Sequence, residues 1–219
     1  MKLPLSDRLL ACAGFVHAGD RVADIGCDHG YLGIYLLKNG IAASMIEADI
    51  NEGPLQSARF NADKYGVADR MTFHLSDGVK EIPRDFDTLV CAGMGADTMI
   101  HILEEAPWLR NRQYRLILQC QSKTPMLRQY LSEHGWHIRR EAVLRDGRFL
   151  YTVMELMFDP DNARLTLAQT YFSPALLQEG GPVLKEYYDR IVEGLRLAVT
   201  HQGDEEKRAI LQELEQIEW

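Results

Sequence analysis

Three short apolar runs in the first half of the chain each end at an aspartate or in a turn that contains one. Asp24 lies near the end of the first run, before a glycine-rich turn that contains Asp28. Asp49 ends the second run, and Asp77 lies beside Gly78 in the turn after the third. Open parallel sheets bind their ligands at the carboxyl ends of their strands. We therefore expect these carboxylates to line one binding site.

The first turn indicates which ligand suits that site. Its glycines, Gly26, Gly30 and Gly33, have the spacing G-x-x-x-G-x-x-G. A dinucleotide pyrophosphate is held instead by G-x-G-x-x-G at a helix N-terminus. Carboxylates at Asp24 and Asp28 would repel a pyrophosphate and attract an ammonium. S-adenosylmethionine carries an ammonium and a sulfonium but no phosphate, so the turn favours this cofactor over NAD.

Each acid has an expected contact. Asp24 would pair with the ammonium, Asp49 would accept hydrogen bonds from both ribose hydroxyls, and Asp77 would accept one from the adenine amine. The cofactor-binding residues that we predict are Asp24, Gly26, Asp28, His29, Gly30, Asp49, Ile50, Asp77, Gly78, Ala92 and Gly93. Any one of these aspartates could instead cap a helix or complete a turn. Their recurrence at three successive strand ends favours the cofactor.

A fourth apolar run ends in small residues. Cys91 and Ala92 lead into Gly93-Met94-Gly95, and small side chains let a flat acceptor group approach the methyl donor closely. An ordinary glycine turn before a helix explains the same residues. The Asn/Asp-Pro-Pro-aromatic motif of many exocyclic-amine methyltransferases is missing here, and we expect Cys91 to be a buried strand residue.

Apolar runs alternate with helical segments in the elements that must position these turns. The expected strands are 21–26, 42–50, 71–75, 87–92, 114–120, 137–144 and 149–158, and the expected helices are 4–15, 31–38, 54–65, 97–105 and 125–134. Asp146-Gly147 predicts a β-hairpin that joins the last two strands. The pattern predicts an α/β fold with a mainly parallel Rossmann-like sheet, helices on both faces and a closing β-hairpin.

The pattern becomes helical after residue 159. Apolar residues recur at intervals of three and four in two stretches, Leu184, Tyr188, Ile191, Leu195 and Ala198, then Ile210, Leu214 and Ile217. Gly203 breaks the pattern between them, and Asp204 can cap the second helix. We expect one domain at 1–159 and a small helical hairpin domain at 160–219 that docks on another part of the protein.

Composition limits the class of protein. The 219 residues are 46% hydrophobic and 26% charged, as in soluble globular proteins. No apolar run approaches the roughly 18 residues of a membrane span, and Pro4, Asp7 and Arg8 interrupt the start where a signal peptide would be apolar. We expect a cytoplasmic protein without membrane contact. The four cysteines form no C-x-x-C pair, so we expect neither a disulfide framework nor a metal site.

Charge is distributed unevenly along the chain. The formal net charge is −8, yet nine basic and three acidic residues lie between 106 and 150, which leaves that stretch at +6. Scattered solvated arginines explain this equally well as a face that contacts nucleic-acid phosphates.

Several motifs together resemble those of the bacterial tRNA (adenine-22-N1)-methyltransferase family. They are Leu5-Ser6-Asp7-Arg8-Leu9, Ala23-Asp24-Ile25-Gly26-Cys27-Asp28-His29-Gly30-Tyr31-Leu32, Ser76-Asp77-Gly78, Ala92-Gly93-Met94-Gly95 and Leu116-Ile117-Leu118-Gln119. The resemblance covers nearly the whole chain. It implies a class I methyltransferase fold with a C-terminal coiled-coil-like domain, and methyl transfer from S-adenosylmethionine to N1 of an adenine in the tRNA D-arm. Ala96 and Cys120 depart from the family pattern, which usually has glycine and proline there, and the C-terminal helices look shorter than usual.

For that reaction the enzyme has mainly to position its substrates, because N1 of neutral adenine already carries a nucleophilic lone pair. Our candidates near the reacting atoms are Asp7, which would stabilise developing positive charge, and Arg8, which would contact a base or phosphate. A helix cap and a solvated arginine are the simpler explanations of this pair. We predict a tRNA-binding track formed by Arg110, Arg112, Arg145 and Arg148.

Two other functions fit the same residues. A methyltransferase acting on a small molecule would share the cofactor site, and so would a non-catalytic protein that binds S-adenosylmethionine. Methyl incorporation into unmodified tRNA separates both of them from the tRNA-modifying enzyme. We expect a monomer or a weak homodimer.

Overall fold

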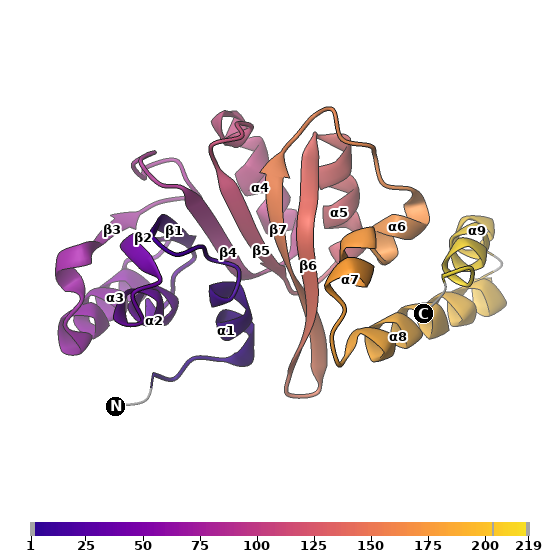
Figure 1. Cartoon of the computed structure of the whole chain (residues 1–219), viewed down its shortest axis with the longest axis horizontal. Helices are drawn as coiled ribbons and strands as arrows, with labels where there is room; N and C mark the ends of the chain where they lie inside the picture. Colours follow the sequence, from indigo (N-terminus) through magenta and orange to yellow (C-terminus); the bar gives the residue numbers. More distant parts are fainter. Residues whose placement is uncertain (1–2, 203, 218–219) are drawn as a thin grey trace.

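The computed structural model describes residues 3–202 and 204–217. Its centre is a seven-stranded sheet with the order β3-β2-β1-β4-β5-β7-β6 (Figure 1). The strands are β1 Asp20–Ile25, β2 Ala42–Asp49, β3 Met71–Leu75, β4 Thr88–Met94, β5 Arg115–Cys120, β6 Trp136–Asp146 and β7 Phe149–Phe158. The first five are parallel, and β7 runs antiparallel between β5 and β6. The predicted sheet with its closing hairpin is confirmed.

Helices cover both faces of the sheet. They are α1 Asp7–Ala13, α2 Tyr31–Lys38, α3 Glu52–Tyr65, α4 Ala96–Glu104 and α5 Thr124–Glu133, with short 3₁₀ turns at Ala68–Arg70 and Pro107–Leu109. Alternate strand residues point to opposite faces, so Val22 and Val90 pack in one core with α1 and α2. Ala23 and Leu89 pack in the other core with α4 and α5.

The fourth strand extends further than the expected end at residue 92. Gly93 takes a left-handed φ of +80°, and the register with β5 shifts between Ala92 and Met94. A glycine adopts this backbone without steric strain. The strand therefore continues through the small-residue turn to Met94, and Gly95 is the N-cap residue before α4.

Four helices, rather than the expected two, follow the sheet. They are α6 Leu167–Tyr171, α7 Pro174–Glu179, α8 Leu184–Gln202 and α9 Glu205–Leu214. The two short helices have clear start signals, because Thr166 and Gln169 form a capping box and Ser173 caps α7. Asp204 accepts from the backbone N–H of Lys207 at 3.0 Å, as expected of a cap, whereas Gly203 lies outside the described residues.

A buried ion pair fastens the C-terminal segment to the sheet. Arg128 of α5 is fully buried and pairs with Glu141 of β6 at 2.7 Å. The same guanidinium donates to the carbonyl oxygens of Thr170 and Tyr171 at 2.8 and 2.9 Å, and Ser173 donates to Glu141. These contacts cross residue 159, and the division into two domains there stays a prediction. Among the described helices, none is long and apolar enough to span a membrane.

Candidate active site

A cavity of about 270 Å³ lies at the carboxyl edge of the sheet, where β1 and β4 end under α1. Its lining is Arg8, Leu9, Asp24, Gly26, Cys27, Asp28, Leu32, Ala92, Gly93 and Gln121. The structure thus brings together five of the predicted cofactor residues and one of the two predicted catalytic residues. Leu9, Cys27, Leu32 and Gln121 are lining residues that the sequence analysis did not assign.

Asp24 is a buried carboxylate that faces this cavity. The residue is 4% exposed, and no described residue donates a hydrogen bond to it. Burial, and then the nearby charge of Asp49, raises the pKa of Asp24 to about 7. A cation in the cavity would supply the missing partner and stabilise the ionised form.

Asp49 holds the glycine-rich turn in place. Its Oδ1 accepts from the backbone N–H of Asn51 at 2.9 Å, and its Oδ2 accepts from that of Asp28 at 3.4 Å. Asp28 has a φ of +51°, a conformation that non-glycine residues adopt at an energetic cost. The hydrogen bond from its N–H helps to maintain this strained turn beside the cavity. The Asp28 side chain itself is exposed to solvent.

Two glycines keep the cavity open. Gly26 has a φ of +76°, and a Cβ there would lie 2.4 Å from Cε of Met94. At Gly93 a Cβ would lie 3.4 Å from Nε2 of Gln121 and 3.5 Å from Nη1 of Arg8. Gly93 therefore brings backbone close to whatever occupies the cavity, as the sequence analysis expected for a flat acceptor group, and Gly26 leaves room for the Met94 side chain.

Glu47 is a buried acid that the sequence analysis missed. It lies opposite Asp24 in the β1–β2 register, and among the described residues only the weakly donating thiol of Cys27 approaches its buried carboxyl oxygens. A Cβ at Gly33 would lie 1.9 Å from its Oε1, so the helix glycine makes room for this side chain. Burial, followed by the charge of Asp24, raises the pKa of Glu47 well above its usual value. A charged residue inside the apolar run 42–50 was the available signal.

Arg8 joins α1 to the ends of β4, β5 and β6. Its Nε donates to Asp146 at 2.7 Å and its Nη1 to Oε1 of Gln119 at 3.4 Å. That same oxygen accepts from the backbone N–H of Gly93 at 3.0 Å. Arg8 is therefore fixed at the cavity wall and is not a freely solvated side chain. Its role in the reaction stays a prediction.

Asp7 is exposed and lies outside the cavity lining. The simpler explanation of Asp7, a helix cap, is wrong because Ser6 caps α1 through the backbone N–H of Leu9. Asp7 occupies the first helical turn, where a carboxylate interacts favourably with the helix dipole. The catalytic assignment of Asp7 stays a prediction.

Six predicted cofactor residues lie near the ends of β1–β3 but not in the cavity lining. These are Asp49, described above, and His29, Gly30, Ile50, Asp77 and Gly78. Asp77 is engaged by Lys80 at 2.6 Å, and that hydrogen bond lowers its pKa. Gly30 starts α2 with a φ of +69°, while Ile50 is exposed. Their contacts with a cofactor stay predictions.

The four arginines of the expected tRNA track do not lie together. Arg110 and Arg112 precede β5 at the amino edge of the sheet, and Arg145 and Arg148 lie at the β6–β7 turn on the opposite edge. The nine residues of β7 from Phe149 to Met157, the partner of Arg115, span roughly 25 Å. Carboxylates also pair with Arg112 and Arg145, namely Asp159 and Glu186. The four arginines therefore do not form one cluster, and their contact with tRNA stays a prediction.

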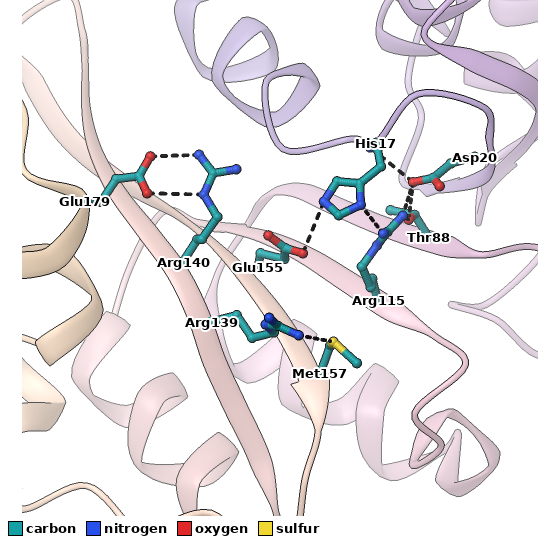
Figure 2. A network of polar contacts seen from close by, with 9 residues as sticks. All are labelled: His17, Asp20, Thr88, Arg115, Arg139, Arg140, Glu155, Met157 and Glu179. Carbon is teal, nitrogen blue, oxygen red and sulfur yellow. Dashed lines mark hydrogen bonds and ion pairs between the residues drawn. The ribbon is translucent and has the colours of Figure 1, made fainter.

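The amino edge is largely neutralised by its own acids (Figure 2). The ion pairs there join Arg115 to Asp20 and Arg140 to Glu179, and Nε2 of His17 lies 3.6 Å from Oε1 of Glu155. The remaining arginine of the group, Arg139, donates to the sulfur of Met157 at 3.1 Å. Pairing of this kind favours a structural role for these basic side chains over phosphate binding. The burial of Arg128, which also belongs to the basic stretch 106–150, favours the same interpretation.

All four cysteines are buried and free. Burial raises the pKa of Cys12 to about 12 and raises those of Cys27, Cys91 and Cys120 as well. The thiols are therefore neutral near pH 7, and the expected burial of Cys91 is confirmed. Within the described ranges, no cluster of three or more His, Cys, Asp or Glu side chains could hold a metal ion.

Sequence comparison places residues 5–154 in the family described as "Methyltransferase domain". The chain is 32% identical over 154 residues to the tRNA (adenine(22)-N(1))-methyltransferase of Bacillus subtilis, a match that spans 70% of this chain and 65% of that protein. It is 30% identical to a putative tRNA methyltransferase of Mycoplasma genitalium over 71% of this chain and 70% of that protein.

Solved structures extend the likeness to nearly the whole chain. The Streptococcus pneumoniae putative tRNA (m1A22) methyltransferase in complex with S-adenosyl-L-methionine has a TM-score of 0.84 and 29% identity, over 96% of this chain and 98% of that one. The Bacillus subtilis m1A22 tRNA methyltransferase TrmK has a TM-score of 0.80 and 27% identity, over 97% and 95%. This chain belongs to the methyltransferase-domain family, and its resemblance to the tRNA (adenine-22-N1)-methyltransferases is confirmed.

Proposed function

We propose that this protein uses S-adenosylmethionine to methylate N1 of adenine 22 in the D-arm of tRNA. The observation that carries the proposal is the buried Asp24 carboxylate, which faces the cavity and receives no hydrogen bond from the described residues. Family membership supports the reaction class, and the tRNA substrate comes from what the relatives are named for.

The residues around the cavity fit the cofactor. Asp24 would hold its ammonium. Asp49 accepts two backbone hydrogen bonds, which leaves lone pairs on a carboxylate for the ribose hydroxyls. Gly26 and Gly93 would allow the ligand to approach the backbone. When bound, S-adenosylmethionine supplies a methyl group on a positively charged sulfur.

The chain's remaining task is to hold the adenine. Because N1 already carries a lone pair, no general base is needed before methyl transfer, and positioning supplies most of the catalysis. Gln119 and Arg8 fix the wall beside Gly93, where the flat base would lie. Asp7, on the first turn of α1, is our candidate for stabilising the cationic product.

A second feature favours a large acceptor over a small molecule. Gln121 lines the cavity and also a groove of about 420 Å³ between the start of α5 and α8. That groove includes the aromatic residues Tyr171 and Tyr187 and the basic residues Lys123, Arg190 and Lys207. The two hollows share a residue, so a long substrate could contact both, whereas a small metabolite would need only the first.

The test uses purified protein, labelled S-adenosylmethionine and an unmodified tRNA transcript. We expect mass spectrometry of the digested nucleosides to show 1-methyladenosine, and a transcript with guanine at position 22 to show none. Cofactor binding without any product in tRNA would contradict the proposal. It would favour a non-catalytic binding protein or a small-molecule methyltransferase.

We also propose a cytoplasmic enzyme, because its substrate would be a cellular tRNA, and a monomer or weak homodimer. Light scattering coupled to gel filtration measures the second point. A stable higher oligomer would contradict it.

A further inference from the structure

The turn of the β6–β7 hairpin lies beside the proposed methyl-donor cavity. Figure 1 shows this hairpin extending between α1 and the start of α8. Arg8 lines the cavity and pairs with Asp146 in the turn, and Arg145 pairs with Glu186 of α8. These two ion pairs hold the turn from both sides, so its other side chains have a defined position at the cavity rim.

One large apolar side chain at this turn is left in solvent. Phe149 is 50% exposed, and its ring lies 6.0 Å from that of Tyr151, tilted by 39°. Phe149 and Tyr151 are two residues apart in β7, so their rings lie on the same face of the hairpin. Arg8 lies 5.6 Å from the centre of the Tyr151 ring. Contacts thus run from the cavity through Arg8 and Tyr151 to the exposed ring.

A cationic group lies beside the exposed ring. The guanidinium of Arg148 lies 4.9 Å from the centre of the Phe149 ring, and no acidic side chain among the described residues pairs with it. Single-stranded or splayed RNA is bound by aromatic rings that stack on bases and by arginines that contact phosphates. A purely apolar protein partner would not explain an arginine left unpaired beside the ring.

We propose that Phe149 stacks on a base that flanks the target adenine, and that Arg148 contacts the adjoining phosphate. Phe149 and Arg148 in the hairpin turn would then hold the tRNA next to the target adenine, and we call this pair the clamp. The inference rests on the proposed function, since it needs an RNA substrate. It also gives the arginine at position 148 a role that Arg110 and Arg112, at the opposite edge, do not share.

Phe149→Ala and Phe149→Trp test the stacking contact by steady-state methylation of tRNA. The Ala variant should raise the KM for tRNA about tenfold, because one aromatic–base stack is lost, whereas Trp should keep it within about threefold of wild type. The dissociation constant of S-adenosylmethionine should not change. Phe60→Ala is the matched control, because Phe60 is 68% exposed on α3 and its loss should leave the KM unaltered.

Arg148→Ala tests the phosphate contact separately. It should reduce the slope of log affinity for tRNA against log salt by roughly 0.7 to 0.9, the value for one lost phosphate contact. An Arg59→Ala variant, at an exposed position of α3, should leave the slope unchanged.

The possible failures are distinguishable. If the wild-type protein methylates tRNA and Phe149→Ala has the same KM and tRNA affinity, the clamp is wrong and the proposed function stands. An equal loss in Phe149→Ala and Phe149→Trp with weakened cofactor binding would show damage to the fold, which also overturns the clamp. If the wild-type protein neither binds nor methylates tRNA, both the clamp and the proposed function are wrong.

Discussion

Replacing Asp24 by Asn should weaken S-adenosylmethionine binding and remove its pH dependence. The cofactor's ammonium needs an ionised partner, and the pKa of Asp24 in the free protein is raised to about 7. The ionised fraction falls from roughly three quarters at pH 7.5 to a few per cent at pH 5.5, so wild-type affinity should fall roughly 20-fold over that range. The Asn variant should bind weakly at pH 7.5 and change little at lower pH.

The same substitution should stabilise the free protein at high pH. The unfolded-state pKa is 3.8 and the folded-state value about 7, so the folded state binds more protons between these values. The free energy of unfolding then falls as pH rises through this window, by up to about 1.4 kcal/mol per pH unit. Asp24→Asn removes this contribution. At pH 8 the variant should therefore unfold at a higher denaturant concentration than the wild-type protein, although it binds the cofactor less well.

Isothermal titration calorimetry in buffers of different ionisation enthalpy measures both the affinity and the protons exchanged. At pH 6 the wild-type protein should release a proton as the cofactor binds, and Asp24→Asn should not. A wild-type affinity that is constant from pH 5.5 to 7.5 would refute the reasoning, as would the same pH slope in the variant.

Three other substitutions test the surroundings of the site. Asp49→Ala should weaken S-adenosylmethionine binding at least tenfold by calorimetry, since hydrogen bonds to a charged group contribute about 1.5–3 kcal/mol each; unchanged binding would remove Asp49 from the site. Gly33→Ala should destabilise the fold despite alanine's higher helix propensity, because the new Cβ would lie 1.9 Å from Oε1 of Glu47. Urea denaturation should show that loss relieved in a Glu47→Ala background, and equal losses in both backgrounds would contradict the contact. Arg128→Ala should reduce the free energy of unfolding by about 3–5 kcal/mol, because Glu141 would remain buried without its partner. A loss below roughly 1 kcal/mol, the value of a surface pair, would mean that the pair is solvated.

Local patterns were sufficient to predict the sheet and its ligand-binding edge. Buried parallel strands are continuous apolar runs that end at polar turns, so the run before Asp24 marked β1, which the structure places at Asp20–Ile25. Asp146-Gly147 specifies its hairpin through local turn geometry alone. The cavity lining followed because the carboxyl ends of neighbouring parallel strands meet at one edge.

Contacts between distant segments could not be predicted in this way. Nothing local indicates that Arg112 pairs with Asp159, 47 residues away, or that Arg128 is buried against Glu141. A count of basic residues therefore overestimated the charge available for RNA. Glu47 escaped notice because one acid in an apolar run does not interrupt the strand pattern, and its relation to Gly33 depends on helix packing.

Reverse transcription of treated tRNA tests the central claim most directly. A methyl group on N1 of adenine lies on the base-pairing edge and stops the polymerase, so one experiment reports both the atom and the position. We predict a strong stop at position 22 with the wild-type protein and S-adenosylmethionine, and a much weaker one with Asp24→Asn. Full-length extension after treatment with the wild-type protein, or a stop at another adenine, would contradict the account.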